Sequence, residues 1–161
     1  MNSAFEHSKV QRELACEFLG VFARFEYALK ATGFATGDGD WCKADWNRFA
    51  EAIQGVLTAS KEPGPRAAID YLLTKPPGKE VLDLSSGTVQ FVESPPDATQ
   101  NKARQVLTMV RRVRNNLFHG GKFGPPAPSD PYHDQRLVEH SLVVLRFRLS
   151  LNADVALAYE R

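Results

Sequence analysis

The chain has 161 residues, of which 20 are basic and 19 are acidic, so its formal net charge is +1. Hydrophobic residues make up 43% and charged residues 24%, and these values exclude a chain too polar to bury a core. No apolar run approaches the ~20 residues that span a membrane, and the amino-terminal residues lack the apolar stretch of a secretion signal. We therefore expect one domain over residues 1–161, located in the cytoplasm and without membrane contact.

The first predicted helix covers residues 3–31. Its apolar side chains recur at steps of three and four, which is typical of a helix with one buried face; they are Val10, Leu14, Phe18, Val21, Phe22, Phe25 and Leu29. Gly33 fits the end of this helix, because glycine readily adopts the left-handed conformation that closes a helix. Cys16 and Cys42 are not spaced as a metal site, so we expect reduced thiols in or near the core.

A loop and two helices are expected next. Residues 36–40 are rich in glycine and aspartate, and we interpret them as a turn-rich loop. A second helix is predicted over residues 43–59, with an apolar face formed by Trp46, Phe49, Ile53 and Leu57. A short third helix over residues 66–74 lies between two breaks that are rich in proline and glycine.

Residues 79–97 have the least regular pattern. Two short segments, 81–84 and 88–92, flank a Ser-Ser-Gly turn and are compatible with a small hairpin. An ordered loop lying over the helices is equally compatible with this stretch. The alternation of side chains alone does not decide between the two.

Two long helices complete the predicted fold. One covers residues 102–123 and ends at a pair of glycines, and the other covers residues 131–149, with a final helical turn at 154–159. The helix over 131–149 is apolar nearly all round, so it is expected either at the centre or partly against a second subunit. The fold class is therefore all-α, an up-and-down bundle of four to five helices with a short irregular or hairpin insertion around residues 79–97.

Positive charge is concentrated on the helix over 102–123. No aspartate or glutamate occurs from Ala98 to Ser129, whereas six basic residues give this window a local charge of +6: Lys102, Arg104, Arg111, Arg112, Arg114 and Lys122. A concentration of this kind is expected of a site for partners rich in phosphate.

Arg114 occupies an unusual place on this helix. With ~100° per residue, Arg114 falls within the apolar arc, between Val110 and Leu107, whereas Arg112 and Asn116 point to the opposite side. An unpaired guanidinium is costly to bury. Something must therefore face it, and the alternatives are a structural carboxylate such as Glu13 or Glu26, a wet cleft, a partner subunit or an anionic ligand.

His119 follows Arg114 near the expected end of the helix. A protonated imidazole is favoured at a helix C-terminus, so His119 is compatible with a capping role. An arginine, an asparagine and a basic cluster lie within two turns of it, and this setting favours a functional histidine instead.

The segment Arg114-Asn115-Asn116-Leu117-Phe118-His119 resembles the Arg-Asn-x-x-x-His signature of the HEPN superfamily of small helical domains. The run from Phe22 to Lys30 also looks like the first helix of small bacterial members. The resemblance implies a metal-independent endoribonuclease, a toxin or defence effector, with Arg114 and His119 at a composite dimer cleft. By resemblance, Arg114 binds the scissile phosphate, His119 transfers protons and Asn115 positions them.

Further expectations follow from this resemblance. Arg111, Arg112, Asn116 and Lys122 are expected to contact RNA or phosphate. The expected partners are an RNA substrate, a second copy of the chain in a homodimer and a cognate antitoxin of the nucleotidyltransferase type. No metal or other cofactor is expected. The alternatives are a non-catalytic HEPN module that binds nucleotide or RNA, and a helical scaffold in which Arg114 is a paired structural residue.

Overall fold

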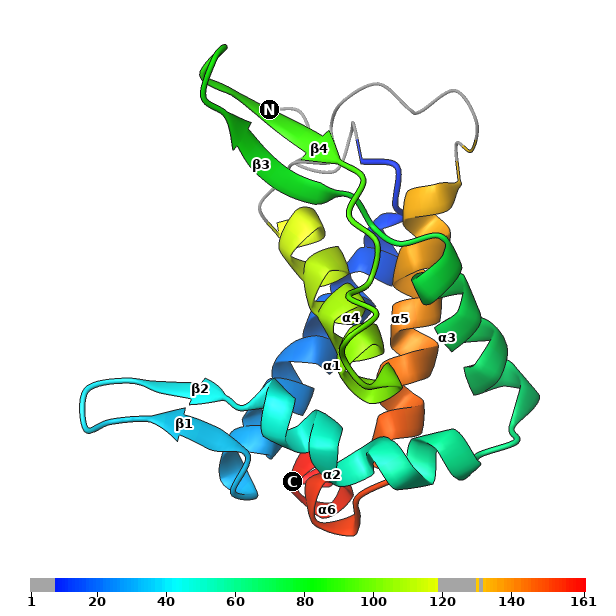
Figure 1. Ribbon diagram of the computed structural model, residues 1–161. Coiled ribbons are helices and arrows are strands. Elements are labelled where there is room, and N and C mark those ends of the chain that lie inside the picture. Colours follow the sequence, from blue (N-terminus) through cyan, green and yellow to red (C-terminus); the bar gives the residue numbers. More distant parts are fainter. Residues whose placement is uncertain (1–7, 119–129, 131) are drawn as a thin grey trace.

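The computed structural model of the chain describes residues 8–118, 130 and 132–161 (Figure 1). These residues contain six helices and four short strands. In chain order they are α1 (Arg12–Ala31), β1 (Ala35–Gly37), β2 (Cys42–Ala44), α2 (Trp46–Ala59), α3 (Pro63–Thr74), β3 (Lys79–Asp83), β4 (Thr88–Val92), α4 (Lys102–Phe118), α5 (His133–Leu149) and α6 (Ala153–Glu160).

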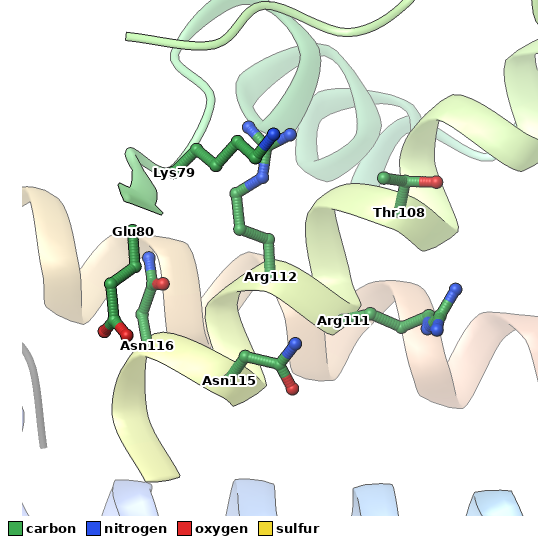
Figure 2. A pocket seen from close by; sticks show the side chains of 7 residues that line it. All are labelled: Lys79, Glu80, Thr108, Arg111, Arg112, Asn115 and Asn116. Atoms are coloured by element: carbon green, nitrogen blue, oxygen red, sulfur yellow. The ribbon is translucent and has the colours of Figure 1, made fainter. Parts of the chain in front are cut away.

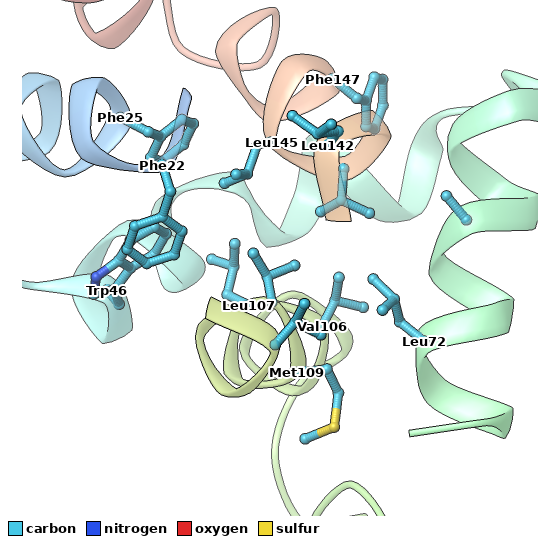
Figure 3. Packing of buried hydrophobic residues seen from close by; sticks show 14 of the residues in the cluster. Phe22, Phe25, Trp46, Leu72, Val106, Leu107, Met109, Leu142, Leu145 and Phe147 are labelled. Carbon is cyan, nitrogen blue, oxygen red and sulfur yellow. The ribbon is translucent and has the colours of Figure 1, made fainter. Parts of the chain in front are cut away.

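The helices α1, α3, α4 and α5 lie side by side, while α2 crosses one end of the group and α6 packs beside α1 (Figure 1). Helix α5 contacts α1, α3, α4 and α6, which confirms the prediction of a central helix. The buried apolar side chains form one continuous cluster (Figure 3). The predicted faces of α1 and α2 supply much of it, since most of their apolar residues are buried or partly buried.

An aromatic stack joins α1 to α2 at the centre of this core. The ring of Trp46 lies 5.3 Å from Phe22 and 5.4 Å from Phe25, and both pairs are stacked. Phe49 meets Phe25 edge to face, with ring centroids 5.5 Å apart. The Trp46 Nε1 donates to Glu26 Oε1 at 3.2 Å, so the polar atom of this large side chain is satisfied.

The predicted helical bundle is confirmed in part, because the described residues are mostly helical but also include two antiparallel hairpins, so the fold is not purely all-α. In the first, β3 pairs with β4 from Lys79 opposite Val92 to Asp83 opposite Thr88, so residues 79–92 form the hairpin and not the loop. The Ser85 and Ser86 hydroxyls donate to Asp83 in the turn and lower the pKa of this carboxyl to about 2.

The second hairpin lies where a turn-rich loop was predicted, and it pairs β1 with β2. A Cβ on Gly37 would lie only 2.1 Å from the Trp41 carbonyl oxygen, so the close approach of the strands requires glycine here. The Asp38 Oδ1 accepts hydrogen bonds from the backbone N–H groups of Asp40 and Trp41, which fixes the turn. Three-residue strands carry too little alternation to be detected in the sequence.

Helix boundaries differ from the predictions for local reasons. Helix α2 begins at Trp46 because residues 42–44 pair with β1 and because Asp45 accepts from the Arg48 N–H as the N-cap. Helix α3 begins at Pro63, since a proline at the first helical position loses no hydrogen bond. Helix α1 begins at Arg12, so the predicted helix is wrong over residues 8–11, while its predicted start at residue 3 lies outside the described residues. Gly33, with φ of 83°, follows the end of α1 as predicted.

Two further findings bear on the sequence expectations. Cys16 and Cys42 are free thiols but are exposed, so their predicted placement in or near the core is wrong. Within the described ranges, no helix combines the length and the apolar character needed to cross a bilayer.

Arg148, in the last turn of α5, is the largest fully buried side chain among the described residues, at 0% exposure. Its three guanidinium nitrogens have no hydrogen-bond partner among the described residues, and burial lowers the pKa of Arg148 to about 9. A buried cation without a partner opposes folding, although the adjacent helix C-terminus favours its charge.

We expect Arg148→Met to raise the free energy of unfolding by about 1–4 kcal/mol, since it keeps the apolar stem and removes the charge. Urea denaturation measures this change. Arg146→Met is the control, because Arg146 is exposed and its ion pair with Glu17 lies at the surface, where the loss is at most about 1 kcal/mol. A lower unfolding midpoint for Arg148→Met would contradict the interpretation of an unpartnered cation.

A cluster of polar side chains joins α3 to α5. The Tyr71 hydroxyl lies 3.0 Å from His133 Nδ1, and the Tyr71 ring lies 4.4 Å from the His140 ring. Burial lowers the pKa of His140 from its ordinary value of 6.5, while Glu139 opposes this shift and Arg136 adds to it. Burial likewise raises the pKa of Tyr71.

Stability should therefore fall as the pH drops below 6.5, the ordinary pKa of histidine, because the unfolded chain binds the proton of His140 more tightly than the folded one. His140→Gln should flatten the dependence of unfolding free energy on pH between about pH 7 and 5. The slope below this range is the internal control, since it reports aspartates such as Asp83 and Asp97, whose pKa values are lowered. Equal slopes for both proteins above pH 5 would exclude this role of His140.

Candidate basic site on helix α4

Helix α4 carries the described residues of the predicted site. Its start is fixed by Asn101, whose Oδ1 accepts from the Arg104 N–H at 2.8 Å, and by Gln54 of α2, whose Oε1 accepts from the Ala103 N–H at 2.8 Å. The predicted site residues in its last turns are Arg111, Arg112, Arg114, Asn115 and Asn116. His119 and Lys122 lie outside the described residues, as do the two glycines expected to end the helix.

Arg112 and Asn116 hold the β3–β4 hairpin against α4. The Arg112 Nη1 donates to the Ser94 carbonyl at 2.7 Å and to the Pro77 carbonyl at 3.1 Å. The Asn116 Nδ2 donates to the Gly78 carbonyl at 2.9 Å, and this side chain is only 3% exposed. Asn116 is one of the buried residues of α4, so its predicted place opposite the apolar face is wrong, and the polar atoms of Arg112 and Asn116 hold the ends of the hairpin. Their predicted contact with RNA stays a prediction.

We expect Asn116→Ala to cost about 1–3 kcal/mol of unfolding free energy, because it leaves the Gly78 carbonyl without its donor. Asn115→Ala is the matched control, since Asn115 is exposed on the same turn and should change stability by about 0.5 kcal/mol or less. Urea denaturation of the two variants gives the comparison. Equal losses at the two positions would show that the Asn116 bond does not anchor the hairpin.

Arg111 lies over the aromatic stack on another side of the helix. Its guanidinium carbon is 6.0 Å from the centre of the Trp46 ring. Burial lowers the pKa of Arg111, and the carboxylate of Glu26 offsets part of this shift. A cation over an indole face is attracted by the ring and keeps its donors directed outward.

Arg114 lies one turn further along, half-buried between two aromatic rings. Its guanidinium carbon is 4.8 Å from the Phe118 ring and 5.5 Å from the Phe22 ring, and its Nη1 donates to Asn115 Oδ1 at 3.1 Å. Among residues 8–118, 130 and 132–161, no ion pair includes Arg114. The predicted structural carboxylates are not its partners there, since Glu13 is exposed and Glu26 accepts from Trp46.

An open pocket of about 410 Å³ lies between α4 and the base of the β3–β4 hairpin (Figure 2). Strand β3 supplies Lys79 and Glu80, which the sequence analysis missed together with Thr108 of α4. The remaining lining residues are Arg111, Arg112, Asn115 and Asn116. Arg112 and Asn116 are bonded to the hairpin. The other donors of the pocket are Lys79, Arg111, the Thr108 hydroxyl and the Asn115 amide, and groups of these kinds bind anions such as phosphate.

The predicted residues are thus only partly brought together. Arg111 and Asn115 line the pocket, and Arg114 is linked to it through its bond to Asn115. In the part of the chain that the structure describes, no three side chains of His, Cys, Asp or Glu are grouped closely enough to hold a metal ion.

Comparison with known proteins gives no match, since no family model fits the chain and neither a curated protein nor a solved structure is significantly similar to it. The function must therefore be argued from the residues of the site.

Proposed function

We propose that this protein is a metal-independent endoribonuclease of the HEPN type. The observation that carries the proposal is the Arg114 guanidinium, which lies near the end of α4 without a carboxylate partner among the described residues. It is bonded to Asn115 and precedes His119 by five positions. The aromatic rings around Arg114 orient a cation without neutralising it, which leaves its charge available to a phosphodiester.

The proposed chemistry uses the internal nucleophile of RNA. The ribose 2′-oxygen attacks the adjacent phosphorus while its proton is removed, and the bond from phosphorus to the 5′-oxygen breaks as that oxygen gains a proton. His119 serves in this proton transfer, since its ordinary pKa is near neutrality. Arg114 binds the non-bridging oxygens, where negative charge grows, and Asn115 orients Arg114. The products are a 2′,3′-cyclic phosphate and a free 5′-hydroxyl.

The wider biological setting is proposed on the resemblance alone. Two copies of the chain would place their Arg114 and His119 residues across one composite cleft. The enzyme would act as a toxin or defence effector in the cytoplasm, controlled by a cognate antitoxin of the nucleotidyltransferase type. The exposed ring of Phe118, beside Arg114, provides apolar surface that such a pairing of subunits could cover.

We expect the purified protein to cleave mixed RNA in the presence of EDTA. Arg114→Ala should lower the rate about 10²–10³-fold through lost charge stabilisation, and His119→Ala about 10²–10⁴-fold through lost proton transfer. Gel analysis of end-labelled RNA measures the rates, and treatment that opens cyclic phosphates identifies the product ends.

Arg104→Ala is the matched control, because it removes an arginine from an early turn of the same helix and should cleave normally. Unfolding curves establish that all variants are folded. Equal cleavage by the wild type, Arg114→Ala and His119→Ala would remove the catalytic assignment.

A non-catalytic module that binds RNA or nucleotide is the second candidate. The pocket favours it, because Lys79, Arg111 and Asn115 offer phosphate donors that act without His119. This candidate would retain RNA in a filter-binding assay and release no new ends.

A further inference from the structure

Two pockets meet at Arg111. The first is the pocket of about 410 Å³ beside β3. The second, of about 220 Å³, lies beside β2, and its walls include Glu26, Lys30, Lys43 and Arg111. The two hairpins project from the same side of the helical bundle (Figure 1). The two pockets share Arg111 as a lining residue, and we call the two together the inter-hairpin groove.

The groove is predominantly basic. Five cations and two carboxylates line the two pockets. Of the carboxylates, Glu26 accepts from Trp46, and of the cations, Arg112 is bonded to the hairpin backbone. The other four cations, Lys30, Lys43, Lys79 and Arg111, take part in none of the ion pairs found within the described ranges. Their charge is available to a polyanion.

An exposed tryptophan lies beside Lys43, which lines the second pocket. Trp41 is 45% exposed, and Lys43 Nζ lies 4.7 Å from the centre of its ring. Its backbone is fixed by the bond to Asp38 and by the close contact with Gly37. An aromatic face beside lysines is the combination on which the bases of a single strand stack.

We propose that the inter-hairpin groove binds single-stranded RNA, with a base stacked on Trp41 and phosphates held by Lys43, Arg111 and Lys79. The inference rests on the proposed function, since it gives the path of the substrate toward Arg114. Unpaired bases are required, because Trp41 can stack only on a base whose face is free. The groove adds Trp41, Lys43 and Lys79 to the residues expected to contact RNA.

The test uses a single-stranded oligonucleotide with 2′-O-methyl riboses, which lacks the nucleophile and cannot be cut. Trp41 should report binding directly, because the only other tryptophan, Trp46, is 4% exposed. Titration should quench the Trp41 emission. Trp41→Ala should abolish this quenching and weaken binding, measured by anisotropy of a labelled oligonucleotide, by about 5- to 150-fold.

Lysine variants test the electrostatic part. Lys43→Gln and Lys79→Gln should each weaken binding and reduce the slope of log affinity against log salt by about 0.7. Tyr27→Ala and Lys61→Gln are the matched controls, since Tyr27 is 63% exposed beside α6 and Lys61 is exposed between α2 and α3. Both controls should bind as the wild type does.

Unchanged affinity in Trp41→Ala would overturn the proposal, as would binding of a duplex in preference to the single strand. These results are independent of cleavage, because the probe is inert. If Arg114→Ala loses cleavage but still binds the probe, the catalytic assignment is supported independently of the groove. If the wild type cleaves RNA but the Trp41, Lys43 and Lys79 variants bind the probe normally, the groove proposal fails and the proposed function stands.

Discussion

The stack of Phe22, Trp46 and Phe25 is the interaction on which the rest of the site depends. It joins α1 to α2, and it gives α4 an aromatic surface to pack against. Arg111 lies over Trp46 and Arg114 lies over Phe22, so two guanidinium groups one turn apart pack on the same aromatic stack. The aromatic rings hold these two guanidinium groups in place and leave their positive charge unneutralised, whereas a carboxylate would hold and neutralise them.

The helical part of the fold could be predicted from the sequence because its signals are local. Apolar steps of three and four on α1 and α2 identified side chains that are buried together in the core. The sequence left the β3–β4 hairpin open as an alternative to a loop, and it did not reveal the β1–β2 hairpin, because strands of three residues carry too little alternation. The β3–β4 hairpin is held by Arg112 and Asn116, which lie 35 and 38 positions along the chain from the Pro77 and Gly78 carbonyls that they bind.

The candidate site was predicted in its helix and residue types but not in its surroundings. A helical wheel placed Arg114 among apolar residues, and the structure gives it ring faces instead of Glu13 or Glu26. The local charge of +6 also overstates what is free, because Lys102 pairs with Asp70 at 3.5 Å and Arg112 is bonded to carbonyl groups. Lys79 and Glu80 could not have been assigned to the site, since only the folding of the hairpin onto α4 brings them there.

The close approach of the strands at Gly37 makes the β1–β2 hairpin sensitive to mutation at this one position. Every other amino acid would bring a carbon atom against the Trp41 carbonyl, so one missense change in that codon would displace the strands without touching the helical core. The turn of this hairpin, by contrast, has room for a side chain at Gly39, where an added Cβ would meet no atom within 4 Å. Related sequences that retain the β1–β2 hairpin should therefore vary at position 39 in its turn, whereas position 37 should remain glycine.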